Sequence, residues 1–148
     1  YKRLHIDIDE RLSHQFQTLI ASDLGTHNTI RRPNGRLVFI DFEFAGWDDP
    51  ITAIANFTLH PGMKPGNKLR KPFVENLLHH FKYYPHIVER YHAMLPLFGL
   101  RWCLIMLNSL RQIPDISSTR LNNQNNHYHL EQFRKSILLF NKIKGINS

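Results

Sequence analysis

The pattern of hydrophobic and polar positions in the first third of the chain predicts one short helix. In residues 9–19, apolar side chains recur at helical spacing on one face, namely Leu12, Phe16 and Leu19. The apolar residues 19–21 then lead into a polar loop that contains Asp23.

Two extended apolar runs follow this loop and predict a β-hairpin. Residues 29–32 and 37–41 flank Pro33, Asn34 and Gly35, and Asn-Gly between extended runs is a strong hairpin signal. Asn28 would lie at the entrance of this hairpin and Asp41 at its exit. We therefore expect these two residues at the same end of the hairpin, although thirteen positions separate them.

The remainder of the chain shows helical periodicity. Residues 46–50 predict a turn in which Asp49 caps a helix over 50–59 and Pro50 takes its first position. Four Pro and Gly residues at 61–66 indicate a loop, and a second helix is expected over about 69–82.

Two longer helices complete the prediction. The third would run from Pro85 to about 112, with Pro96 and Gly99 kinking or splitting it. It carries the apolar residues Val88, Tyr91, Leu95, Leu104 and Ile105. Residues 114–126 are polar and Asn-rich, which is typical of a loop. The last helix, over about 127–143, would bury a stripe formed by Leu130, Phe133, Ile137 and Phe140. The pattern predicts an α+β, mostly helical fold with one small β element.

Length and composition narrow the class of protein. A chain of 148 residues with 42% hydrophobic residues suggests one domain, or one lobe of a larger one. Tyr1 in place of Met suggests a fragment, with a processed N-terminus as the alternative. The single cysteine, Cys103, allows no disulfide within the chain and fits a small core residue in a reducing, cytoplasmic protein. We expect no stretch of the ~18 apolar residues that span a bilayer, and no membrane partner.

The formal charge of +7, with ten histidines besides, would favour nucleotides, phosphorylated ligands or nucleic acid. The basic residues are scattered, however, and only 31–36 and 64–71 approach clusters. The scattered basic residues therefore favour a solvated basic surface over a nucleic-acid-binding face.

The spacing of polar residues in the loop and hairpin indicates phosphoryl transfer. Asp23 could orient and deprotonate an acceptor hydroxyl. Asn28, five positions later, offers a neutral oxygen to magnesium, and Asp41 offers an anionic one. Glu43 is a further candidate metal ligand; alternatively it binds a ligand-bound water, supports the metal ligands from behind, or is an ordinary surface residue. Because Asp and Asn are also common in turns, the argument depends on the combination rather than on any one residue.

Residues 21–57 resemble the aminoglycoside phosphotransferase and choline kinase superfamily, which has a protein-kinase-like fold. Residues 22–28, SDLGTHN, are similar to its His-Gly-Asp-x-x-x-x-Asn loop, and residues 40–50, IDFEFAGWDDP, to its metal-binding strand end. The resemblance implies that Asp23 is the catalytic base and that Asn28 and Asp41 hold Mg²⁺ on ATP. It also implies that residues 1–148 form the C-terminal catalytic lobe and that an N-terminal nucleotide-binding lobe is absent from this chain. This fragment alone would then be inactive.

Two positions depart from the family pattern. Ala21 stands where the family usually has His, and Ala53 stands where many relatives carry Asp. The contacts that support the catalytic loop would then differ from those in the family. The resemblance also implies aromatic side chains around the acceptor, and Trp47, Tyr91 and Trp102 are tentative members of such a pocket, with core packing as the alternative.

The histidines elsewhere in the chain do not form a metal-binding pattern. His79, His80, His86 and His92 lack a regular ligand pattern, and His60, His127 and His129 are most simply surface residues.

The sequence therefore predicts an ATP- and Mg²⁺-dependent phosphotransferase acting on a hydroxyl of a small molecule such as an aminoglycoside, sugar or amino alcohol. The main alternative is a catalytically inactive kinase-like binding protein. A basic nucleic-acid-binding domain and a protein kinase are weaker alternatives.

Overall fold

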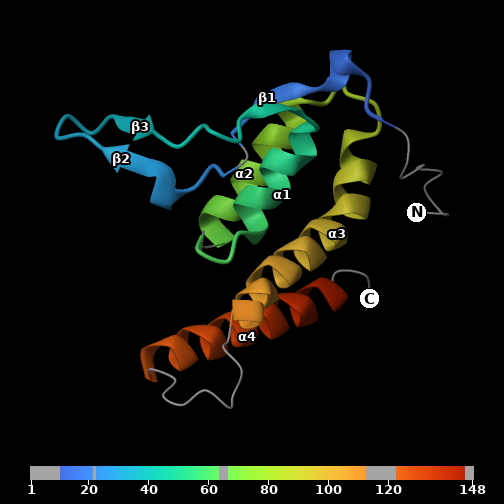
Figure 1. Cartoon of the computed structure of the whole chain (residues 1–148). Coiled ribbons are helices and arrows are strands. Elements are labelled where there is room, and N and C mark those ends of the chain that lie inside the picture. Colours follow the sequence, from blue (N-terminus) through green and yellow to red (C-terminus); the bar gives the residue numbers. More distant parts are fainter. Residues whose placement is uncertain (1–10, 22, 64–66, 113–122, 146–148) are drawn as a thin grey trace. The chain divides into compact units, whose positions relative to one another are not determined.

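The structure is a computed structural model that describes residues 11–21, 23–63, 67–112 and 123–145. It is α+β and mostly helical, as predicted, with two small antiparallel sheets and four α-helices among these residues (Figure 1). The chain divides into two compact units, Tyr1–Leu95 and Pro96–Ser148. The division falls inside a helix rather than in a linker, and each unit is described by itself.

The predicted hairpin is present in the first unit. Strand β2 (Thr29–Arg31) pairs with β3 (Leu37–Phe39), with Ile30 opposite Val38. Gly35 in the connecting turn has a φ of 83°, which glycine adopts without the strain that a Cβ would cause. The Asn-Gly signal therefore located this hairpin correctly.

The predicted helix over 9–19 is wrong where the structure describes it; residues 9 and 10 lie outside the described part. A 3₁₀ turn, η1 (His14–Phe16), is followed by strand β1 (Thr18–Ile20). This strand pairs with β4 (Gly46–Asp48), so that Leu19 lies opposite Trp47. The helical spacing of three apolar residues is a weak preference, and pairing with a distant strand overrides it.

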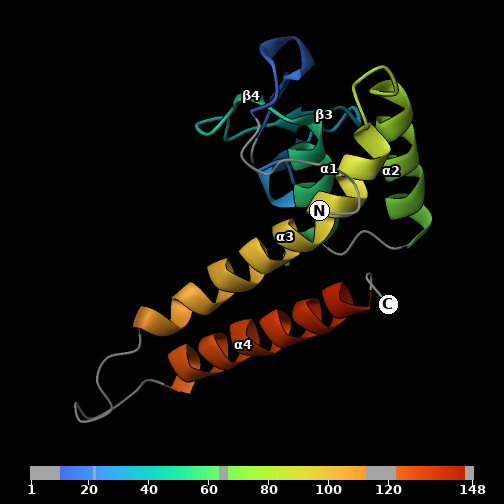
Figure 2. The same ribbon diagram turned by 90° about the vertical axis from the view of Figure 1, so that its right-hand side faces the viewer.

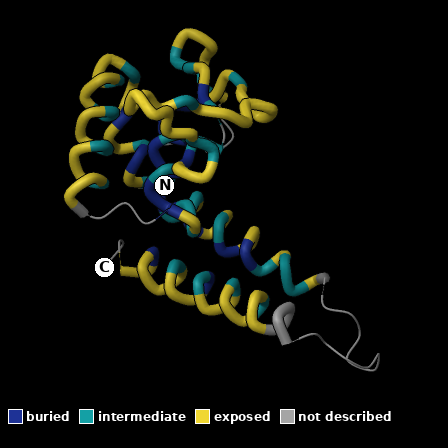
Figure 3. The backbone as a smooth tube through the Cα atoms, turned by 90° about the vertical axis from the view of Figure 1, so that its left-hand side faces the viewer, coloured by how far each residue is buried: buried dark blue, intermediate teal, exposed yellow. Residues whose placement is uncertain are grey.

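Helix α1 (Pro50–Leu59) begins where the sequence predicts. The Asp49 carboxylate accepts a hydrogen bond from the Ile51 amide at 3.0 Å, and Pro50 occupies the first turn. Ile51, Ile54 and Ala55 are fully buried, which makes α1 the centre of the first unit (Figure 3). The Phe57 ring stacks on Phe73 of α2 (Asn67–His80), with 3.9 Å between centroids.

Helix α3 (Ile87–Asn108) passes through Pro96 as one continuous helix, so Pro96 and Gly99 do not split it, and the alternative of a kink stays a prediction. Among the described residues, the segment Ile87–Arg111 is long and apolar enough to cross a membrane. The expectation that no such stretch exists is therefore also wrong. A core helix of a soluble protein passes the same test, so the absence of a membrane partner remains a prediction.

The second unit consists of the later part of α3, the 3₁₀ turn η3 (Ser109–Gln112) and α4 (Asn123–Lys144) (Figure 2). Helix α4 begins four residues before the predicted start, so residues 123–126 are not loop. The rest of the predicted loop, residues 114–122, lies outside the described residues.

The predicted buried stripe of α4 is wrong. All four of its members are exposed, from 44% to 60%: Leu130, Phe133, Ile137 and Phe140. The residues of α4 that are buried are Ser136 and Ile143, which pack against Cys103 and Gly99 of α3. The Ser136 hydroxyl donates to the Cys103 carbonyl at 3.4 Å, and a Cβ on Gly99 would overlap the Ile143 side chain. Small residues allow the two helices to approach closely, so the bulky residues of α4 remain outside.

Candidate functional site

The loop that carries Asp23 closes on itself through Asn28. The Asn28 amide nitrogen donates to the Asp23 carbonyl at 3.0 Å and to Asp23 Oδ2 at 3.2 Å. Gly25 precedes the 3₁₀ turn η2 (Thr26–Asn28) as its N-cap residue. The Gly25 carbonyl accepts hydrogen bonds from the backbone amide of Asn28 and from the Thr29 hydroxyl. The spacing of five positions therefore brings the two side chains into direct contact.

The hairpin places Asp41 beside this loop. The Ile40 amide donates to the Asn28 carbonyl at 3.0 Å, which continues the register of β2 and β3 by one residue. Asp41, the next residue, is exposed and has a φ of 64°, in the left-handed region. Residues other than glycine adopt this conformation infrequently, and Asp is among those that tolerate it best. Asn28 and Asp41 thus lie at the same end of the hairpin.

The remaining predicted site residues differ widely in exposure. Glu43 is exposed in the turn in which the Ala45 amide donates to the Phe42 carbonyl. Trp47 is 67% exposed on β4, whereas Tyr91 is only 7% exposed, and burial raises the pKa of its phenol. Trp102 is half-buried and belongs to the second unit. Core packing therefore describes Tyr91, and the acceptor pocket formed by the three aromatic residues stays a prediction.

Two histidines, His27 and His60, lie against the Asp23 carboxylate. His27 Nε2 is 3.1 Å and His60 Nε2 is 3.6 Å from Asp23 Oδ1. The two imidazole rings stack on each other, with centroids 4.8 Å apart and 18° between their planes. Sequence reasoning treated His60 as a surface residue, but its side chain is only 18% exposed.

His60 is held at the end of α1 by its backbone and by its ring. Its amide donates to the Asn56 carbonyl at 2.9 Å, and its Nδ1 accepts from the Gly62 amide at 3.1 Å. Burial, and secondly the nearby His27, lower the pKa of His60, while Asp23 opposes this shift. The lowered pKa favours the neutral ring at pH 7, and because Nδ1 accepts from Gly62, the proton of that ring is on Nε2, the nitrogen nearer to Asp23.

Only part of this cluster had a signal in the sequence. His27 follows Asp23 by four positions within one loop, so a contact between them could have been inferred. His60 is 37 positions from Asp23 and reaches it because α1 ends beside the loop. The same region anchors the loop, since the Thr26 amide donates to the Met63 sulfur at 3.2 Å.

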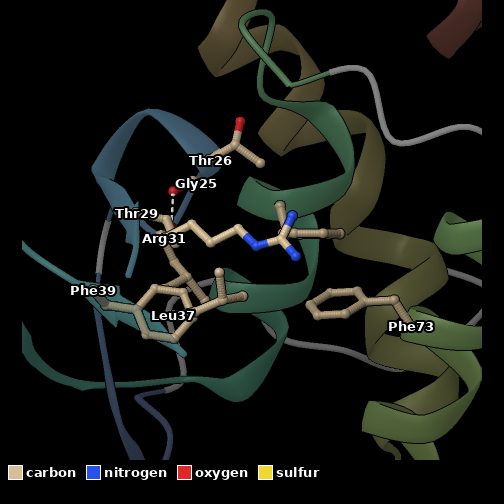
Figure 4. A pocket seen from close by; sticks show the side chains of 9 residues that line it. Gly25, Thr26, Thr29, Arg31, Leu37, Phe39 and Phe73 are labelled. Atoms are coloured by element: carbon tan, nitrogen blue, oxygen red, sulfur yellow. Dashed lines mark hydrogen bonds between the residues drawn. The ribbon is translucent and has the colours of Figure 1, made fainter. Parts of the chain in front are cut away.

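A cavity of about 430 Å³ adjoins the loop in the first unit. Its wall is mostly apolar and includes Leu37, Phe39, Phe57 and Phe73, while the Arg31 guanidinium extends across it (Figure 4). Gly25, Thr26 and Thr29 bring the backbone of the Asp23 loop to its edge.

A buried ion pair lies at the N-terminal end of α1. Arg90 of α3 contacts the Asp49 carboxylate, and the two side chains are 13% and 10% exposed. Burial raises the pKa of Asp49, although the Ile51 amide and Arg90 oppose this shift. Asp49 is thus a buried structural cap, as the sequence predicts, and its partner Arg90 had no sequence signal.

No protein-family model, curated protein or solved structure matches this chain.

Proposed function

We propose that the chain carries the catalytic residues of a phosphotransferase that moves the γ-phosphate of ATP to a hydroxyl of a small molecule. The observation that supports this most is the double hydrogen bond from the Asn28 amide to Asp23, beside the hairpin end that holds Asp41. These residues would supply one group of each required kind, namely a base and two oxygen ligands for the metal.

The residues fit magnesium in their chemistry. The Asn28 amide nitrogen is engaged with Asp23, so the side-chain oxygen is the atom that remains to face a cation. The Asp41 carboxylate is exposed at the end of the hairpin. Neutral and anionic oxygens are the ligands that a hard cation prefers. Magnesium bound by these two residues would neutralise charge on the phosphates.

Asp23 would orient the acceptor hydroxyl and take its proton. Its carboxylate is 43% exposed, so a substrate can reach it, while Asn28 restrains the Oδ2 side. Most of the rate would come from alignment of the hydroxyl with the phosphate and from charge neutralisation. The acceptor class, an alcohol on a sugar, aminoglycoside or amino alcohol, is proposed from the sequence resemblance alone.

Equilibrium binding of ATP to the 148-residue chain, with and without Mg²⁺, tests the proposed ligands. We expect Mg²⁺ to increase the affinity and Asp41→Ala to remove that increase. Glu75→Ala, which removes an exposed carboxylate on α2, is the matched control and should leave it unchanged. Binding that is independent of Mg²⁺, or equal in the Asp41 and Glu75 variants, would contradict the proposal.

Transfer of labelled phosphate from ATP to a panel of hydroxylated amines, sugars and aminoglycosides tests the base, measured with this chain joined to the N-terminal nucleotide-binding lobe that the resemblance implies. Asp23→Asn should abolish transfer and preserve Mg²⁺-dependent ATP binding. Transfer that survives Asp23→Asn would assign the base to another residue.

A catalytically inactive kinase-like protein is the second candidate. It is favoured by the two imidazoles that face Asp23 Oδ1, the oxygen that an acceptor hydroxyl could otherwise use. Mg²⁺-dependent ATP binding without transfer to any hydroxyl in the panel would support this candidate.

A further inference from the structure

Three ligand-type atoms converge on one point of the first unit. They are Oδ1 of Asp23, Nε2 of His27 and Nε2 of His60, and all lie within 4.8 Å of one another. In the part of the chain that the structure describes, no other group of three His, Cys, Asp or Glu residues meets this condition. Asp41 and Glu43, the carboxylates expected near magnesium, lie outside the group.

The spacing of these atoms matches a metal centre. Ligand atoms bonded at about 2.1 Å to a tetrahedral ion are about 3.4 Å from each other. The two separations from Asp23 Oδ1, 3.1 and 3.6 Å, lie on either side of this value. The two imidazole nitrogens lie within 4.8 Å of each other, and movement of the rings would set their final spacing around an ion.

The chemistry of the ligands selects the kind of ion. Two imidazoles with one carboxylate suit zinc and similar transition metals, whereas magnesium prefers oxygen ligands alone. Three protein ligands also leave a fourth position for water or a ligand. The hydrogen bond from Asn28 to Asp23 Oδ2 would orient the carboxylate, as contacts outside the ligand shell do in metal centres.

One local change must accompany binding. The Gly62 amide donates to His60 Nδ1, so the neutral ring carries its proton on Nε2. A metal on Nε2 moves that proton to Nδ1, and the Gly62 amide then loses its acceptor and turns to water. Because this hydrogen bond is exposed, the solvent can replace it.

We propose that Asp23, His27 and His60 form a binding site for a divalent transition metal of the zinc class. Occupation of this site takes the Asp23 oxygen that faces the histidines. Inhibition of phosphate transfer by zinc follows only if the proposed function is correct, whereas the binding itself does not depend on it.

Calorimetric titration of the full 148-residue chain with Zn²⁺ alone, without nucleotide, tests the site. We expect one site whose affinity falls at least tenfold in His27→Gln and in His60→Gln. His79→Gln removes an exposed histidine from the last turn of α2, and it should leave that affinity unchanged. Absence of binding, or equal affinities in all three variants, would overturn the proposal.

A second measurement does not depend on how the variants fold. In the unsubstituted chain, Zn²⁺ should shift the amide resonance of Gly62 together with the ring resonances of His27 and His60. If Zn²⁺ binds and these resonances do not move, the ion is held elsewhere and the proposal fails. Because neither titration contains ATP, failure of the phosphotransferase proposal would not alter these results.

Discussion

Asn28 links the two parts of the candidate site. Its side chain holds Asp23, and its carbonyl accepts from Ile40 at the hairpin end next to Asp41. The side chain is therefore needed for the orientation of the proposed base, and the backbone for the position of the proposed metal ligand.

Asn28→Ala removes both side-chain hydrogen bonds and preserves the backbone one. We expect it to lower the free energy of unfolding by about 1 kcal/mol, because two partly buried hydrogen bonds are exchanged for contacts with water. Chemical denaturation would measure this change. Asn34→Ala, in the turn of the same hairpin, is the control that separates an effect on the Asp23 loop from a general weakening of the hairpin. Equal losses in the two variants would contradict a special role of Asn28.

The raised pKa of Asp49 predicts a specific pH dependence. A carboxyl whose folded-state pKa lies above its unfolded value of 3.8 stabilises the folded state most below pH 3.8, and this contribution is lost as the pH rises through the folded-state pKa. The difference in unfolding free energy between the unsubstituted chain and Asp49→Asn should therefore decrease from pH 4 to pH 7. Urea denaturation of both proteins over this interval measures it. An increase with pH would mean that Arg90 outweighs burial.

Helix α1 depends on its first residues and on one distant partner. Asp49 caps the helix through the Ile51 amide and pairs with Arg90 of α3, so one side chain performs two tasks. The cap is local and was predicted from Asp49-Pro50, whereas the ion pair joins positions 41 apart.

Substitutions at these two positions separate the cap from the ion pair. Asp49→Ala and Asp49→Asn both leave the buried Arg90 guanidinium without its carboxylate, and Asp49→Ala should lower the unfolding free energy by about 1 kcal/mol more than Asp49→Asn, which retains a capping oxygen. Arg90→Gln retains the cap and should lower the unfolding free energy by about 3 kcal/mol at neutral pH, because it leaves a buried carboxylate without its cation. Thermal or urea unfolding would measure these differences in unfolding free energy. An Arg90→Gln variant as stable as the unsubstituted chain would contradict the role of the ion pair.

The contact between α3 and α4 in the second unit depends on Gly99. Replacement of a helical glycine by alanine normally stabilises a helix, but here the new Cβ would overlap Ile143. We expect Gly99→Ala to destabilise the protein by about 1–3 kcal/mol through overpacking. In the background of Ile143→Ala the same substitution should become neutral or stabilising. A double-mutant cycle of unfolding free energies measures this coupling, and additive effects would exclude the proposed contact.

Taken as a whole, the molecule exposes many large apolar side chains. On α3 and α4 they include Leu104 and Leu138, which are 68% and 70% exposed. Large patches of exposed apolar side chains are uncommon on monomeric soluble proteins, and they commonly mark binding surfaces.

This exposed surface should bind an apolar dye. We expect ANS to fluoresce in the presence of the folded chain, and the double substitution Leu104→Glu with Leu138→Glu to reduce the signal several-fold. Lys68→Glu, an exposed change on α2, serves as the control. An unchanged signal after the double substitution would place the dye elsewhere.

Short-range signals were sufficient for the hairpin, for α1 and for the neighbourhood of Asp23, Asn28 and Asp41. A capping residue, a proline at the first helical position and an Asn-Gly turn each act over a few residues, so their effects can be predicted from the sequence alone. The register of the hairpin then determines that Asp41 lies at the same end as Asn28.

Long-range contacts explain what the sequence patterns did not predict. Strand β1 forms because β4 pairs with it, and Ser136 and Ile143 are buried because small residues on α3 let α4 approach on that side. His60 faces Asp23 only because α1 ends next to the loop. Each of these features depends on a partner distant in sequence, so it is settled by how the elements pack and not by any local pattern of residues.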